Sequence, residues 1–181
     1  MNHYFLVSSL PTLVPGERPG ITREEFLRRA ADQLGPDDLE LLRGRFTDAL
    51  PAADDPLSRE WRAVETTLRN ASARQRAARL GVEVRPHLRE SDGDAGLEAA
   101  VVAAFNAPDP LAREIALETI RQTALERLAG FDPFTFRALQ CYALRLHLAW
   151  RRADLDAERG RANAARLAGL PAPEPAGVPT P

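Results

Sequence analysis

The chain has 181 residues, of which 28% are charged and 44% hydrophobic, and its formal net charge is -2. This composition is ordinary for a soluble globular protein and carries no basic excess that would favour nucleic acid or an anionic membrane as the main partner. All 24 basic residues are arginine, which excludes the chemistries that depend on a P-loop, pyridoxal phosphate or Schiff-base lysine, and a single cysteine excludes an internal disulfide and Cys-based zinc sites.

The N-terminal apolar run, residues 3–10, ends at Pro11. Its Tyr, Phe and Val residues favour a strand, its length equally allows a short helix, and no second strong strand follows to pair with it. Because an isolated strand leaves its backbone groups unpaired, we expect a helical turn or an extended segment packed on helices. The run lacks the basic residues of a signal peptide, and no stretch approaches the roughly 18 apolar residues of a membrane span, so we expect a cytoplasmic protein.

Two short helices are expected next. Thr22 and Glu25 form the Thr-x-x-Glu pattern of a capping box, and the apolar stripe that follows is expected to end at Gly35 as its C′ residue. Pro36 then suits the first position of a second helix, with two aspartates in its first turn. The buried side of this helix is expected to comprise Leu39, Leu42 and Phe46.

The longest regular pattern follows a break at residues 51–56. Mostly apolar residues recur at alternating spacings of four and three, as in a heptad seam, and Gly81 is expected to end this helix. The seam consists of Leu57, Trp61, Val64, Leu68, Ala71, Gln75 and Ala78. Between residues 59 and 89 there are eight arginines and three glutamates, the one locally basic region. Because no aromatic residues alternate with these arginines, a solvated or salt-bridged face is favoured over nucleic-acid or phosphate binding, which stays the alternative.

Three further helices are expected, from Leu97 to Phe105, from Asp109-Pro110 to Leu128, and from Asp132-Pro133 through Trp150 toward Arg159. In the last two an aspartate cap precedes a proline at the first helical position. Residues 85–96 are expected to form a loop, and residues 169–181, with five prolines, a disordered tail. The sequence therefore predicts an all-α protein: an irregular bundle of about five to six helices with a short N-terminal apolar segment, in a helical domain 1–168 followed by the Pro-rich tail 169–181.

Chemistry-bearing side chains are scattered along the chain. His3, His87 and His147 lie far from one another and from Cys141, whereas a metal site needs convergent ligands. The serines at positions 8 and 9 lack the Gly-x-Ser-x-Gly elbow of a nucleophile, and the paired aspartates lie at expected helix starts or in loops, where capping explains them. We therefore expect no catalytic residue, no cofactor and no metal.

The last helix has two apolar sides. At 100° per residue, the expected core face comprises Ala138, Leu139, Tyr142, Leu146, Ala149 and Trp150. A second apolar strip lies opposite, among arginines, and an internal helix or a partner protein must cover it. The candidate partner-interface residues are Cys141, Leu144, Arg145, Leu148 and Arg152.

Two stretches carry a resemblance to a known family. The first runs from Tyr4 to Pro11 as Tyr-Phe-Leu-Val-Ser-Ser-Leu-Pro and is followed by Ile21-Thr22 and Phe26. The second is Tyr142-Ala143-Leu144-Arg145-Leu146, followed by Arg151 or Arg152 and by Leu155-Asp156-Ala157-Glu158-Arg159-Gly160. Together they resemble the two ends of an uncharacterised bacterial family encoded within V/A-type ATPase operons. Between them, the match consists of helical character and Leu68-Arg69-Asn70.

The place of those genes implies a counterpart of the all-helical central-stalk subunit, which couples the rotor shaft to the membrane ring. The resemblance therefore implies a non-catalytic subunit or assembly factor of a proton- or sodium-translocating ATPase. Its partners would be the other ATPase subunits, with no nucleic acid, no small-molecule substrate and no direct membrane insertion. It would be located in the cytoplasm, where the ATPase complex could hold it at the surface of the inner membrane.

Overall fold

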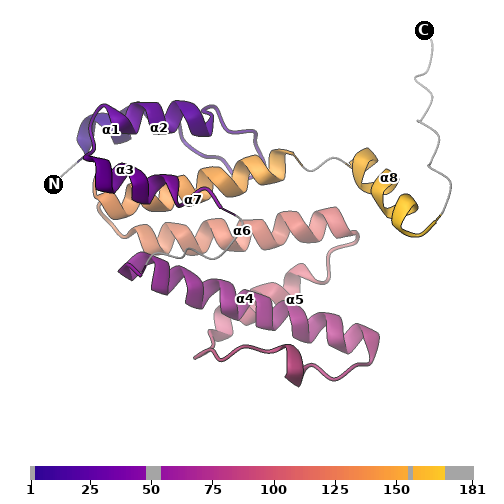
Figure 1. The fold of residues 1–181 in the computed structure, drawn as a ribbon. Coiled ribbons are helices and arrows are strands. Elements are labelled where there is room, and N and C mark those ends of the chain that lie inside the picture. Colours follow the sequence, from indigo (N-terminus) through magenta and orange to yellow (C-terminus); the bar gives the residue numbers. More distant parts are fainter. Residues whose placement is uncertain (1–2, 48–53, 155–156, 170–181) are drawn as a thin grey trace, which may run out of the picture.

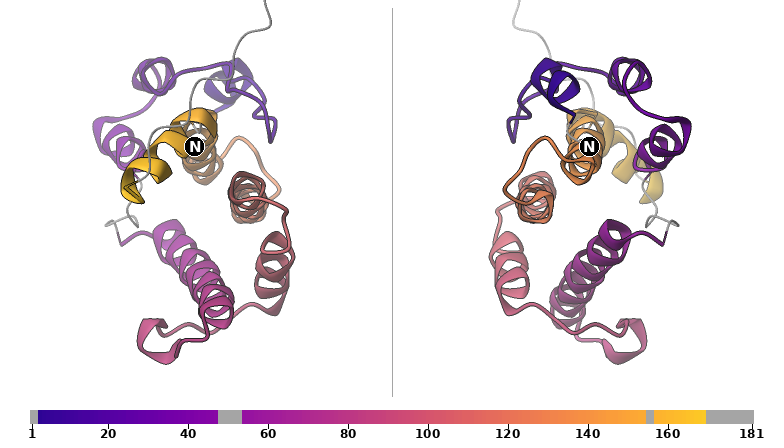
Figure 2. Two further views of the ribbon diagram at one scale, coloured as in Figure 1. Left: turned by 90° about the vertical axis from the view of Figure 1, so that its right-hand side faces the viewer. Right: turned by 90° about the vertical axis from the view of Figure 1, so that its left-hand side faces the viewer.

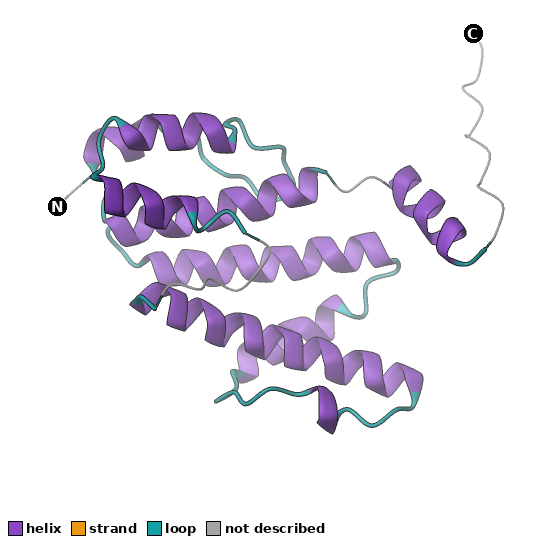
Figure 3. Cartoon of the chain, viewed as in Figure 1, coloured by secondary structure: helices purple, strands orange, loops and turns teal. Residues whose placement is uncertain are grey.

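The computed structural model describes residues 3–47, 54–154 and 157–169. Within these ranges the chain forms eight α-helices and one 3-10 turn, without strands (Figures 1 and 3). The elements are α1 (Tyr4–Ser9), α2 (Arg23–Ala31), α3 (Pro36–Arg43), α4 (Pro56–Leu80), η1 (Arg85–His87), α5 (Ala95–Ala104), α6 (Pro110–Ala129), α7 (Phe136–Ala153) and α8 (Ala157–Leu167). The all-α prediction is confirmed, with more helices than the five to six expected. Almost all of the expected disordered tail, residues 170–181, lies outside the described residues.

The N-terminal apolar run forms a single short helix, α1, one of the two arrangements expected for it. The side chain of Leu6, in the middle of α1, is fully buried. The backbone N–H of His3, which precedes the helix, donates to the carbonyl oxygen of Phe134 at 2.8 Å. The start of the chain is thereby held against the start of α7, more than a hundred residues away in sequence.

The caps of α2 and α3 agree only partly with the sequence prediction. Thr22 caps α2, because its hydroxyl accepts the N–H of Glu25 at 3.1 Å. However, α2 ends at Ala31 rather than at Gly35. Gly35 has an ordinary φ of -69° and is instead the N-cap of α3, whose first residue is Pro36 as predicted. The expected C′ glycine therefore belongs to the start of the next helix.

Local signals define both ends of α4. The Asp55 carboxylate accepts the N–H of Ser58 at 3.1 Å, Pro56 is the first helical residue, and Gly81 ends the helix at a φ of 66°. The predicted seam is buried at its start, whereas at its end Ala78 is exposed and Ala77 is buried in its place. At 100° per residue Ala77 lies on the side of α4 opposite to the start of the seam, so the end of α4 buries a different face from the one that the seam predicts.

The last long helix begins later than predicted. The Asp132 carboxylate accepts the N–H of Phe134 at 2.9 Å, which makes a turn rather than a helix cap. Thr135 is the N-cap, and α7 starts at Phe136 instead of Pro133. It ends at Ala153, and α8 is a separate helix that stands apart from the others in Figure 1.

Three groups of buried side chains hold the helices together, and α7 contributes to two of them. Figure 2 shows α7, in orange, between the indigo N-terminal helix α1 and the magenta α4. The N-terminal core joins α1, α2 and the α3 region to one face of α7, through residues including Leu6, Phe26, Leu42, Leu139 and Leu146. The central core joins the opposite face of α7 to α4 and α6, through Leu57, Trp61, Ala124, Leu125, Cys141 and Leu144. The distal core joins α4, α5 and α6, through residues including Leu68, Val101, Phe105 and Leu117. The central position of α7 explains why it is apolar on two sides.

Candidate interaction site

The second apolar strip of α7 lies inside the molecule. Cys141 and Leu144 are 1% and 4% exposed, and both belong to the central core with Trp61 of α4 and Leu125 of α6. Leu148 is half-buried at the edge of the same cluster. The sequence left open whether an internal helix or a partner protein covers this strip. In the structure the cover is internal and consists of α4 and α6. Because α4 and α6 cover Cys141 and Leu144, these two side chains do not face a partner in this structure, whereas the interface role of Leu148, Arg145 and Arg152 stays a prediction.

The two arginines predicted beside the strip form a polar seam between α6 and α7. Arg145 donates through Nε to Gln122 Oε1 at 2.9 Å and pairs with Glu126 at 2.8 Å. Arg152 pairs through Nε with Glu118 Oε2 at 2.9 Å. Both also donate to the N-terminal loop: Arg145 to the carbonyl of residue 13, and Arg152 to the carbonyls of residues 16 and 17. Their role here is to tie that loop onto the helices.

Glu118 is the buried acid of this seam. Desolvation by burial raises its pKa above the ordinary range, against opposing contributions from Gln122 and Arg152. Gln122 donates to Glu118 at 3.3 Å and to the backbone carbonyl of Arg145 at 3.1 Å. No sequence prediction named Glu118 or Gln122, although two polar residues four apart on the buried face of α6 indicate such a seam.

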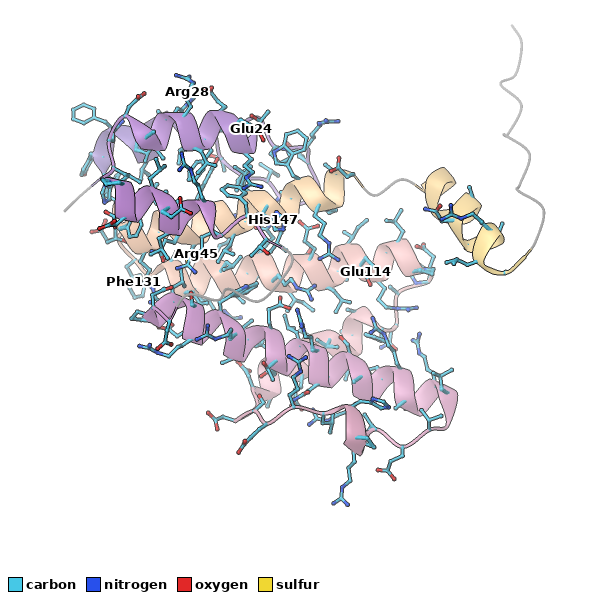
Figure 4. The ribbon with its side chains drawn as sticks, in the orientation of Figure 1. Glu24, Arg28, Arg45, Glu114, Phe131 and His147 are labelled. Atoms are coloured by element: carbon cyan, nitrogen blue, oxygen red, sulfur yellow. The ribbon has the colours of Figure 1, made fainter. Side chains whose placement is uncertain are left out.

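Arg45 is the most deeply buried charge in the described structure (Figure 4), with 1% of its surface exposed. It donates to Ser58 Oγ at 2.6 Å, to Asp55 Oδ2 at 2.8 Å and to Gln140 Oε1 at 3.1 Å. Burial alone would raise the pKa of Asp55, but hydrogen bonds from Ser58 and Arg45 outweigh it and lower that pKa to about 2. Arg45 thereby joins the end of the α3 region to α4 and α7, which no sequence pattern indicated.

The histidines and the cysteine lie in separate places. His3 faces Phe136 at 6.0 Å between ring centroids, His147 stands edge-on to Phe46 at 6.3 Å, and η1 holds the remaining histidine. Among the described residues, no three potential metal ligands come together. Burial raises the pKa of the Cys141 thiol to about 12, so it is protonated at neutral pH and is a poor nucleophile.

The arginine-rich face of α4 is engaged largely within the molecule. Arg59 and Arg62 pair with Asp54 at 3.2 and 3.3 Å, and Arg74 pairs with Glu98 at 3.0 Å. In addition, Arg69 pairs with Glu65, and Arg79 donates to the carbonyl of Phe105 while lying over its ring. These contacts favour a salt-bridged face over a phosphate-binding surface, because each engaged guanidinium would have to leave its carboxylate or carbonyl.

Hollows on the described surface include the following three. One, about 530 Å³, lies between α4 and residues 90–94 and has both polar and apolar lining residues. Another, about 270 Å³, is lined by residues including Phe46, His147 and Trp150. The third, about 460 Å³, lies between the N-terminal segment and the α6–α7 turn and is mainly apolar. None of the three brings together a nucleophile, a base and an oxyanion donor among the residues that line it.

Comparison with family models, curated proteins and solved structures finds no match to this chain. None of the helices in the described part of the chain combines the length and the apolar character needed to cross a membrane. The main features of the structure are the central helix α7, which is buried on two sides, and the N-terminal loop, which is hydrogen-bonded by Arg145 and Arg152.

Proposed function

We propose that this protein is a non-catalytic subunit or assembly factor of a bacterial V/A-type proton- or sodium-translocating ATPase, with a central-stalk-like coupling role. It would act on the cytoplasmic side of the inner membrane, through contacts with the other ATPase subunits. The proposal starts from the two terminal stretches that resemble the family encoded in ATPase operons.

One observation supports it most directly: the two stretches, far apart in sequence, pack into one unit. The Tyr142 hydroxyl donates to the carbonyl of Pro11 at 2.8 Å, and its ring stacks on Phe26 with centroids 5.6 Å apart. The Trp150 indole N–H donates to the carbonyl of Ile21 at 2.9 Å. A resemblance carried mainly by the two ends of a chain is more coherent when those ends form a common core.

The packing also suits a coupling role. A subunit that transmits torque must resist deformation, and close-packed helices with fixed side chains do so. Here α7 is held on one side by the N-terminal core and on the other by the central core, while Arg45 and Arg152 bridge between elements.

The first test is affinity purification of the tagged chain from its native bacterium. We expect ATPase subunits to co-purify, and the gene to lie in an ATPase operon. An untagged strain controls for adventitious binding. A chain carrying Leu146→Asp, which places a carboxylate in the N-terminal core, controls for folding and should recover no subunits. Absence of every ATPase subunit from the wild-type eluate, together with a gene outside any ATPase operon, would refute the proposal.

A second measurement distinguishes coupling from assembly. Membranes from a deletion strain should hydrolyse ATP while building a much smaller ion gradient, because the catalytic head is intact and the transmission of torque is weakened. If the ATPase fails to assemble at all, the assembly-factor form of the proposal is supported instead. Unchanged gradients and unchanged assembly would contradict both forms.

A further inference from the structure

One end of the molecule displays aromatic rings that folding leaves exposed. Phe5 and Phe131 are 86% and 108% exposed, and Phe131 projects from the α6–α7 turn (Figure 4). Tyr4, itself 56% exposed, stacks on Phe134 with ring centroids 3.7 Å apart. We call these four residues the aromatic end. The stacked pair Tyr4–Phe134 has little side-chain entropy left to lose on binding, and the exposed rings of Phe5 and Phe131 belong to the same two elements, α1 and the α6–α7 turn.

The mainly apolar hollow of about 460 Å³ adjoins the aromatic end. Val7, one turn beyond Tyr4 on α1, lines it, as do Gly130 and Pro133 on either side of Phe131 in the α6–α7 turn. The space remains because the helices present small residues there, Ala129 and Ala138 among them. The ion pair Arg145–Glu126 contributes its charged lining. A ligand for this region is therefore largely uncharged, with apolar groups on the side that faces the rings.

The proline-rich segment, residues 170–181, has this character. Its sequence is Leu-Pro-Ala-Pro-Glu-Pro-Ala-Gly-Val-Pro-Thr-Pro, with five prolines and a single charge. A polyproline II helix has three residues per turn, so every third residue shares a ridge. Two ridges are wholly apolar: Leu170, Pro173, Ala176 and Pro179 on one, and Ala172, Pro175, Val178 and Pro181 on the other. The third ridge carries Glu174 and Thr180. The pattern is thus amphipathic at the period of a polyproline II helix.

We propose that the proline-rich segment of one copy docks as a polyproline II helix on the aromatic end and the adjoining hollow of a second copy. Proline rings packed on aromatic side chains are a general mode of peptide recognition, which exploits the preformed and extended ligand. The two apolar ridges face the rings and the hollow, and the ridge with Glu174 faces solvent. This inference is independent of the ATPase role.

Geometry favours a second copy over the same chain. The aromatic end and α8 lie at opposite ends of α7 (Figure 1). Because α7 has 18 residues, its length is about 27 Å, whereas twelve residues of polyproline II span about 37 Å. A segment that first ran back along α7 would keep only about three residues for docking. A segment from a neighbouring copy has all twelve available.

The test is the association state of the full chain by sedimentation, from about 5 µM to 1 mM. We expect reversible self-association with a dissociation constant on the order of 100 µM, in the range of small, transient interfaces. The substitution Phe131→Ser removes a fully exposed ring, and the double substitution Pro173→Asp with Pro175→Asp places a charge on each apolar ridge. Each change should weaken association at least tenfold, whereas Glu174→Gln on the polar ridge should leave it unchanged.

All of these substitutions lie at an exposed ring or in the proline-rich segment, so melting temperatures should match that of the wild type and loss of folding cannot mimic the result. A full chain that remains monomeric at 1 mM overturns the proposal. So does self-association that survives the two proline substitutions, because the aromatic ends would then be covered by something other than the proline-rich segment. The two results are independent of co-purification with ATPase subunits, which tests the proposed function separately.

Discussion

Replacing Leu144 by alanine tests whether the second apolar strip of α7 is internal. Leu144 is 4% exposed and packs in the central core with Leu57 and Trp61 of α4 and with Leu125 of α6. Because three helices enclose the site, the surrounding side chains can collapse only partly into the space that alanine leaves. The change therefore removes both buried apolar surface and packing contacts.

The expected cost is about 3 kcal/mol in the free energy of unfolding, within the range of about 2–5 kcal/mol for leucine-to-alanine changes in cores. For a protein of this size that corresponds to a fall in Tm of about 6–12 °C. Leu146→Ala, which acts on the N-terminal core, should cost a similar amount because Leu146 is fully buried. Leu111→Ala, at a leucine of α6 that is 37% exposed, should cost less than about 1 kcal/mol.

Urea unfolding followed by circular dichroism measures all three variants under the same conditions. The reasoning would be refuted by a Leu144→Ala chain as stable as the wild type beside a strongly destabilised Leu146→Ala chain. That outcome would mean that α4 and α6 do not cover the strip in solution. It would favour the alternative that a partner protein covers the strip.

Three other predictions concern hydrogen bonds and backbone conformation. Hydrogen bonds in the fold hold the pKa of Asp55 at about 2, below its unfolded value, so its contribution is present above about pH 4 and is lost as the pH falls toward 2. Acid titration of stability should show a loss of about 1–2 kcal/mol, because solvent screens a partly exposed carboxylate, and this loss should be absent from Asp55→Asn. Gly81→Ala should cost about 1 kcal/mol in thermal unfolding, because φ is 66° and an added Cβ meets no atom within 4 Å, which leaves backbone strain as the cause. Tyr142→Phe should cost about 1 kcal/mol in urea unfolding, through the lost bond to Pro11, and an unchanged midpoint would contradict that contact.

Helix starts and stops were largely readable from the sequence. The caps at Thr22 and Asp109 and the stop at Gly81 all occur where predicted, because each depends on contacts within about four residues. The start of α7 was predicted at Pro133 rather than Phe136, and this error also has a local cause. Several residues near the start of α7 could serve as the cap, and Thr135 takes that role while Asp132 makes a turn.

Burial of particular side chains was decided by the tertiary structure. Arg43 and Arg45 are the same residue type two positions apart, yet Arg43 is exposed to solvent and Arg45 is buried. Arg45 is 1% exposed and donates hydrogen bonds to Asp55 and Gln140. Likewise, the angular pattern of α7 correctly indicated two apolar faces but not what covers the second. Caps are local, whereas a cover depends on which distant helices pack together, and that is why only the folded chain could distinguish an internal strip from a docking surface.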